Sequence, residues 1–150
     1  MTSIVSFGPE TRVNTSTAGD QVESKVIRLP DGGYLVAWSD QGQNSSDVLF
    51  QRYDAAGSPV GSETRVNTTT ANIQSAPSVA LLADGGFVVT WMSYGQDGQY
   101  GGIYHQRYGV DGLPVGAETR VNTTAAGNQQ FPAVIALADG GYVVFWDDLG

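Results

Sequence analysis

Three short apolar runs, each ending in tryptophan, dominate the hydrophobic pattern of the chain. They are Tyr34–Trp38, Phe87–Trp91 and Tyr142–Trp146. In the middle run, Phe87 and Val89 would point to one face of a strand and Val88 to the other, so both faces are largely apolar. Strands of this kind must be covered on both sides. The pattern therefore predicts buried β-strands within stacked sheets.

Turn signals place these runs inside antiparallel hairpins. Asp-Gly-Gly precedes each run, at 31–33, 84–86 and 139–141, and itself follows another apolar run. This is a strong signal for a tight hairpin. In two copies a second hairpin follows, written "QRYDAAGSPV" and "QRYGVDGLPV". For the middle copy we expect four strands, at Val79–Leu82, Phe87–Trp91, Ile103–Tyr108 and about Val115–Asn122.

The sequence "ETRVN" occurs three times, at Glu10–Asn14, Glu63–Asn67 and Glu118–Asn122. Its polar character suits an outer edge strand. The copies define one three-repeat domain over 1–150, with repeat 1 at about 10–62, repeat 2 at about 63–117 and repeat 3 at 118–150, completed by residues 1–9. A four-stranded unit of roughly 50 residues with two apolar faces predicts an all-β fold built of β-propeller blades.

Three blades are too few for a closed propeller, which typically has 4–8. We therefore expect a homodimer that closes a six-bladed ring. In that ring a hybrid blade would combine Ala133–Leu137 and Tyr142–Trp146 of one subunit with the N-terminal strands of the other. Two alternatives stay open at this point, namely a β-trefoil, which needs no partner, and a fragment of a longer array.

Composition narrows the function classes. The 20 glycines and six prolines, with only 15% charged residues, fit a turn-rich β protein. A net charge of −8 argues against nucleic acid and anionic membranes as partners. There is no cysteine and no apolar run long enough for a membrane span. Met1–Glu10 lacks the features of a signal peptide.

Catalytic groups are sparse. The single histidine, His105, lies within a predicted strand, where packing is its usual role. Asp147 and Asp148 follow a strand and read as solvated loop residues rather than as a glycosidase pair. No nucleophile triad or phosphate-binding loop is visible. We predict that the protein is not an enzyme.

Repeated polar and aromatic residues suggest ligand binding instead. The candidate ligand-binding residues are Trp38, Trp91, Trp146, Arg52, Arg107, Glu63 and Glu118, with Glu10 as the first copy of the glutamate. Tryptophan faces stack on sugar rings, and arginine and glutamate hydrogen-bond sugar hydroxyls. Repetition would make such binding multivalent. The competing interpretation is structural, with Trp packing between blades and Arg/Glu fixing strand register.

Two loops, 39–47 and 93–102, are rich in Gly, Asp and Gln. Loops on a rigid scaffold often determine which ligand a protein binds, so these loops are candidates for that role. Asp40, Asp47 and Asp97 are possible calcium ligands, although their spacing matches no EF-hand or RTX nonapeptide pattern. We expect no other cofactor.

The order "PSVALLADGGFVVTW…GIYHQRYGVDGLPVG" resembles blades of sialidase-like (BNR) propellers. The chain is still more similar to tandem repeats of large bacterial surface and secreted proteins, including RTX-associated ones. The Asp-box of BNR blades is matched only at Asp54 and Gly57, and the middle unit has Gly109 instead of the aspartate. The resemblance implies a propeller and a secreted or cell-surface location. For function it leaves a multivalent carbohydrate-binding module or a structural, adhesive repeat that contacts proteins.

Overall fold

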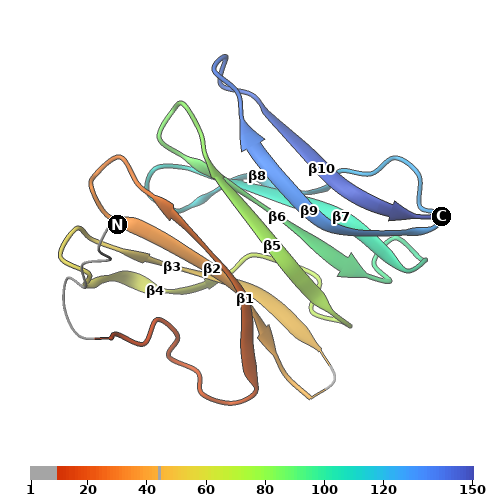
Figure 1. Cartoon of the computed structure of the whole chain (residues 1–150), viewed down its shortest axis with the longest axis horizontal. Coiled ribbons are helices and arrows are strands. Elements are labelled where there is room, and N and C mark those ends of the chain that lie inside the picture. The colour runs from red at the N-terminus through yellow and green to blue at the C-terminus, as the bar shows by residue number, and fades with distance from the viewer. Residues whose placement is uncertain (1–9, 44) are drawn as a thin grey trace, which may run out of the picture.

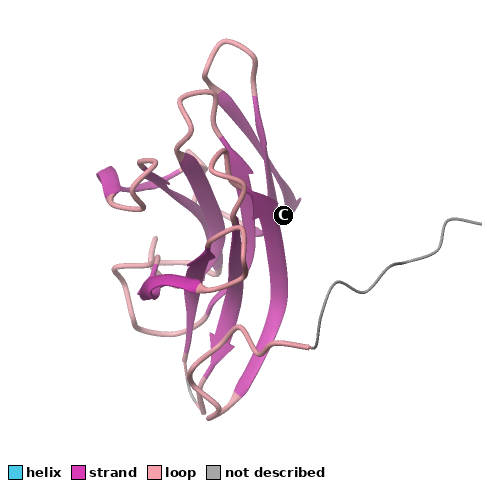
Figure 2. Ribbon diagram, turned by 90° about the vertical axis from the view of Figure 1, so that its left-hand side faces the viewer, coloured by secondary structure: helices cyan, strands magenta, loops and turns pink. Residues whose placement is uncertain are grey.

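The computed structural model describes residues 10–43 and 45–150. Within these residues the protein is all-β, with ten strands in three antiparallel sheets and no helix. Accordingly, the described part of the chain contains no helix that could cross a membrane. Figure 1 shows the three sheets in chain order, coloured red to yellow, green to cyan and blue. Figure 2 shows only strands and connecting loops between them. The all-β prediction is confirmed.

Each of the first two repeats forms its own four-stranded meander. The first sheet holds β1 (Asp20–Arg28), β2 (Tyr34–Gln41), β3 (Ser46–Tyr53) and β4 (Pro59–Arg65) in that order. The second holds β5 (Gln74–Leu81), β6 (Phe87–Tyr94), β7 (Gly101–Tyr108) and β8 (Pro114–Arg120). The third pairs β9 (Asn128–Ala136) with β10 (Tyr142–Leu149). These sheets resemble propeller blades.

The Asp-Gly-Gly turns form as predicted. In the first sheet, Leu29 N donates to Gly33 O at 2.8 Å, and Gly33 N donates to Asp31 Oδ1 at 2.9 Å. Gly32 has φ of 89°, and a Cβ on Gly33 would lie 2.2 Å from Tyr53 O. Glycine is therefore required at both positions. The same turn recurs in the other two sheets.

The sheets stack face to face. One face of the first sheet, carrying Leu35, Val48 and Phe50, packs on the face of the second that carries Phe87 and Trp91. The opposite face of the second sheet packs on the third through Ala80, Leu82 and Val88 against Val134, Tyr142 and Val144. In the second sheet Val88 and Val89, which point to opposite faces, are both fully buried. The prediction of strands covered on both sides is confirmed for this sheet.

The arrangement differs from a β-trefoil, because each unit keeps its own sheet and the sheets meet by stacking. An isolated parallel bridge, Ser46 to Ile73, joins the end of the first sheet to the segment before the second. The described residues form an open stack of blade-like sheets and do not close a ring. Ring closure by a second copy is therefore a proposal.

The inner strands are longer than predicted. β5 begins at Gln74 rather than Val79, and β9 begins at Asn128 rather than Ala133. A β-bulge interrupts β5, with Ala76 in the left-handed region at φ 53°, and Phe131 adopts the same φ in β9. The polar, proline-containing sequence before each apolar run suggested a loop, but the bulge lets the strand continue through it.

The first "ETRVN" copy also differs from its prediction. Glu10–Asn14 forms no strand, whereas the other copies supply the ends of β4 and β8. The N-terminal strand predicted to complete the third repeat falls on residues 1–9, which lie outside the described residues.

Candidate binding site

The three tryptophans occupy different environments. Trp91 is fully buried between the first and second sheets, where its Nε1 donates to Gln74 Oε1 at 3.3 Å and its ring stacks on Tyr104. Trp38 is buried, with 3% of its surface exposed, at the wall of a cavity of about 260 Å³ that residues 12–14 also line. Trp146 is the only one of the three that is substantially exposed. Two of the three predicted stacking surfaces are thus closed to a ligand in this structure.

Each arginine of the predicted pocket pairs with the aspartate of its own Asp-Gly-Gly turn. Arg52 lies 3.7 Å from Asp31, and Arg107 lies 3.2 Å from Asp84. Arg52 stands opposite Leu35 in the sheet, three residues from Trp38 on β2. An odd separation places Arg52 and Trp38 on opposite faces. The structure therefore does not bring Trp and Arg of one sheet together.

The glutamates join successive "ETRVN" segments. Glu118 accepts hydrogen bonds from Thr68 N at 2.7 Å, Thr68 Oγ1 at 3.0 Å and Gln96 Nε2 at 2.7 Å. Glu63 accepts from Thr15 N in the equivalent way. In both cases the threonine follows an "ETRVN" copy and the glutamate belongs to the next copy. These contacts fix one repeat against the next.

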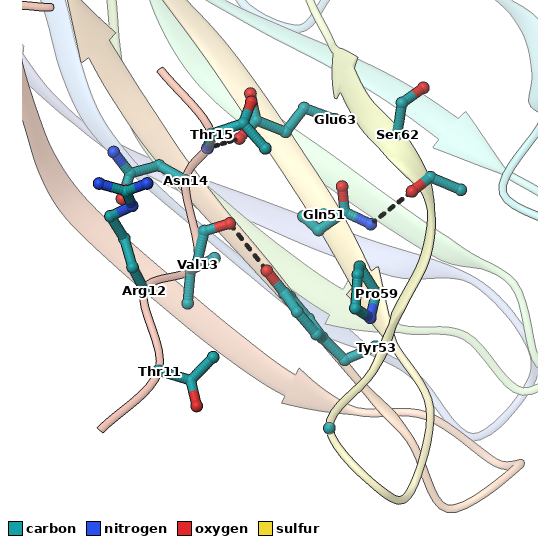
Figure 3. A pocket seen from close by; sticks show the side chains of 12 residues that line it. Thr11, Arg12, Val13, Asn14, Thr15, Gln51, Tyr53, Pro59, Ser62 and Glu63 are labelled. Carbon is teal, nitrogen blue, oxygen red and sulfur yellow. Dashed lines mark hydrogen bonds between the residues drawn. The ribbon is translucent and has the colours of Figure 1, made fainter. Parts of the chain in front are cut away.

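An open crevice of about 740 Å³ lies beside the contact between Thr15 and Glu63 (Figure 3). It separates residues 11–15 from the β3–β4 hairpin of the first sheet. Tyr53 Oη donates to Val13 O at 2.8 Å across its floor, and Glu63 closes one end. Exposed Arg12 lines it as well. The crevice offers an aromatic ring, amides and a guanidinium.

A second crevice, of about 380 Å³, occupies the equivalent place one repeat later. It lies between residues 64–68 and the side chains of Gln106, Tyr108 and Pro114 of the second sheet. Sequence analysis named Glu63, which lines the first crevice, but did not predict Arg12, Tyr53 or Tyr108 as crevice residues. The verbatim recurrence of "ETRVNT" was the available signal, since it implies one contact made at several equivalent places.

The aspartates suggested as calcium ligands are each engaged elsewhere. Asp40 accepts from Gln21 Nε2 at 2.9 Å, Asp47 accepts from Asn67 Nδ2 at 2.6 Å, and Asp97 lies 3.8 Å from Arg120. No group of three or more acidic or histidine side chains in the described ranges is placed to hold a metal ion. Calcium binding stays an untested hypothesis.

The single histidine links the second sheet to the third. His105 Nδ1 lies 2.9 Å from Tyr142 Oη, so a neutral imidazole can accept a hydrogen bond from the tyrosine hydroxyl. Burial and, to a smaller extent, the charge of Arg107 lower the pKa of His105 below its usual value. Burial also raises the pKa of Tyr142, which keeps the phenol protonated. The lowered pKa of His105 favours the neutral imidazole, in which Nδ1 can accept this hydrogen bond.

We expect stability to fall as the pH drops below about 6.5, the unperturbed histidine pKa. The unfolded chain takes up a proton on His105 there, while the folded chain, with its lowered pKa, resists protonation. The contribution of His105 to the free energy of unfolding is fully present above pH 6.5. It is lost as the pH falls through the pKa that His105 has in the folded protein. Melting temperatures between pH 7.5 and 5 measure it. The His105→Phe variant, which copies Phe50 of the first repeat, should show a flatter profile, and an unchanged profile would contradict this assignment.

Comparison with family models gives no match to this sequence, and comparison with the curated proteins gives no significant match. The similarity to sialidase-like and RTX-associated repeats accordingly stays a prediction.

Proposed function

We propose that this chain is a non-catalytic structural or adhesive repeat module that binds a second copy of itself face to face. The observation that carries the proposal is the outer face of the third sheet. Val143 and Phe145 on β10 are 36% and 55% exposed there, whereas Leu35 and Val88, the counterparts of Val143 in the other sheets, are 0% exposed. Ile135, opposite Val143 on β9, extends the same apolar surface.

Repeat equivalence indicates what covers this surface. In the first and second sheets the same face is buried against the opposite face of the following sheet. The apolar surface of the third sheet is therefore shaped to receive another sheet of this kind. An exposed apolar face of this kind marks an interaction surface.

The complementary face is present on the first sheet of the same chain. Tyr34 and Val36 are half-buried there, while their counterparts in the second sheet, Phe87 and Val89, are sealed by the neighbouring sheet. A sheet docked from a second copy would complete this face.

Docking the third sheet of one copy on the first sheet of another is a head-to-tail contact. When made twice with twofold symmetry, such a contact closes a ring of six blade-like sheets, within the range of known propellers. We propose this homodimeric ring as the full fold. The hybrid blade completed by the partner's N-terminal strands, and a secreted or cell-surface location, belong to the same proposal.

The concentration dependence of thermal stability tests the proposal. A protein whose folded form is an obligate dimer melts at higher temperature as its concentration rises. We expect the melting temperature to increase measurably between about 1 and 100 μM. A melting temperature independent of concentration would contradict an assembly that completes the fold.

A second candidate function is multivalent carbohydrate binding, which the two equivalent crevices favour. Each pairs a tyrosine with amide and hydroxyl groups, the chemistry of a sugar site. Glycan arrays test it, and Arg12→Ala should weaken whatever binding they reveal. Arg28→Ala, an exposed arginine outside the crevices, serves as the matched control. Equal binding by both variants, or no binding at all, would speak against the crevices.

A further inference from the structure

We infer that Tyr94 and Tyr100, in and beside the loop between β6 and β7, form a stacking platform for a neutral sugar ring. This inference goes beyond the proposed function and concerns a different surface from the crevices. Among the described residues these are the two exposed tyrosines, with 40% and 57% of each accessible. The other tyrosines are buried or half-buried in the sheets.

The two rings already form a pair. Their centroids lie 6.4 Å apart, and their planes meet at 64°. At this angle one ring can lie flat on a ligand while the other contacts the ligand from the side. The hydroxyl of each phenol can hydrogen-bond at the edge of the platform. Tyrosine supplies such contact area at low cost in conformational entropy.

The backbone of both tyrosines is fixed. Tyr94 N donates to Ile73 O at 2.8 Å, and Asn72 Nδ2 donates to Tyr94 O at 3.3 Å. Gly95 N donates to Tyr100 O at 2.6 Å, which closes the loop. The next amide, of Gly101, donates to Asn128 Oδ1 at 3.0 Å. Two neighbouring segments of the chain thus hold the platform in place before any ligand arrives.

Side chains within the loop point inward and anchor it. Ser93 Oγ lies 2.6 Å from Gln96 Oε1, and Gln96 Nε2 donates to Glu118 Oε1. The carboxylate of Asp97 is fully buried, where it accepts from Gln99 N at 3.3 Å and lies near Arg120. Preorganisation of this kind reduces the entropy lost on binding.

The chemistry of the platform selects the ligand class. Its accessible groups are two phenol rings and the exposed Gln99 amide, because the one acidic side chain of the loop is buried. Aromatic faces match the C–H face of a pyranose, and amide and hydroxyl groups match its edge. A net charge of −8 disfavours acidic sugars. The ligand is therefore a neutral hexose polymer or oligomer.

Within residues 10–43 and 45–150 the platform occurs once. The corresponding loop of the first sheet, between β2 and β3, contains no aromatic residue. A two-copy ring would thus carry two platforms, and binding to a polymer would gain from both.

Native gel electrophoresis through dissolved neutral polysaccharides tests the inference. The probes are hydroxyethyl cellulose, mixed-linkage β-glucan, xyloglucan and galactomannan. We expect at least one to retard the intact protein, and the double substitution Tyr94→Ala with Tyr100→Ala to weaken binding at least about 10-fold. Phenylalanine at both positions keeps the rings and should preserve most of the retardation.

Leu113→Ala alters an exposed apolar residue on another turn and should migrate like the unmodified protein. Unretarded migration of the intact protein in all four polymers would overturn the inference. Full retardation of the folded Tyr94→Ala/Tyr100→Ala variant would overturn it equally.

Discussion

Replacing Trp91 by alanine should lower the free energy of unfolding by about 3–5 kcal/mol, the usual cost of truncating a buried tryptophan. The side chain is fully buried between two sheets, stacks on Tyr104 and donates a hydrogen bond to Gln74. Its removal leaves a cavity at the centre of the stack and an unpaired amide oxygen. For a chain of this size, the melting temperature should fall by about 10 °C or more.

Chemical denaturation and thermal melting measure this loss. Trp91→Phe keeps most of the volume and should cost considerably less. The result distinguishes the two roles suggested for the repeated tryptophans. If Trp91→Ala melted within a few degrees of the unmodified protein and lost only ligand binding, Trp91 would be a ligand-binding residue and its packing role would be wrong.

Replacing Phe145 by glutamate should dissociate the assembly. The side chain is 55% exposed in a single chain, so the substitution should change the stability of the isolated stack by less than about 1 kcal/mol. In the docked state the carboxylate would be buried against Tyr34 and Val36 of the second copy without a partner. Such burial costs several kcal/mol, which weakens association more than about 100-fold. Sedimentation velocity over a concentration series measures the shift.

Val115→Glu is the matched control for this substitution. Val115 is similarly exposed but lies on β8, the outer strand of the second sheet. It is therefore away from the proposed interface between the third sheet of one copy and the first sheet of the other. It should leave the association unchanged. Equal dissociation by both variants, or by neither, would contradict the assignment of the third sheet's outer face.

The sequence predicted the blade-like units because their signals are local. Asp-Gly-Gly turns and two-faced apolar strands follow from turn geometry and from the alternation of side chains. Strand boundaries were harder to predict, because β5 continues through Ser75 and Pro77 by means of a bulge at Ala76. The left-handed backbone conformation of Ala76 depends on tertiary contacts. One of them is the hydrogen bond from Ala76 N to Glu23 Oε2 at 2.6 Å.

The candidate site was harder still, because its residues are distant in sequence. Trp38 and Arg52 lie in one repeat and were both candidate ligand-binding residues, but strand register places them on opposite faces. Glu118 instead contacts Thr68, fifty residues away, through stacking of successive sheets. No local pattern shows which repeated residue faces the next repeat and which faces solvent.

The mass of the protein in solution is the most direct test of the central claim, that the outer face of the third sheet binds the first sheet of a second copy. Sedimentation equilibrium or light scattering at micromolar concentration should give twice the chain mass of 15.8 kDa. A well-folded particle of the single-chain mass under these conditions would contradict it.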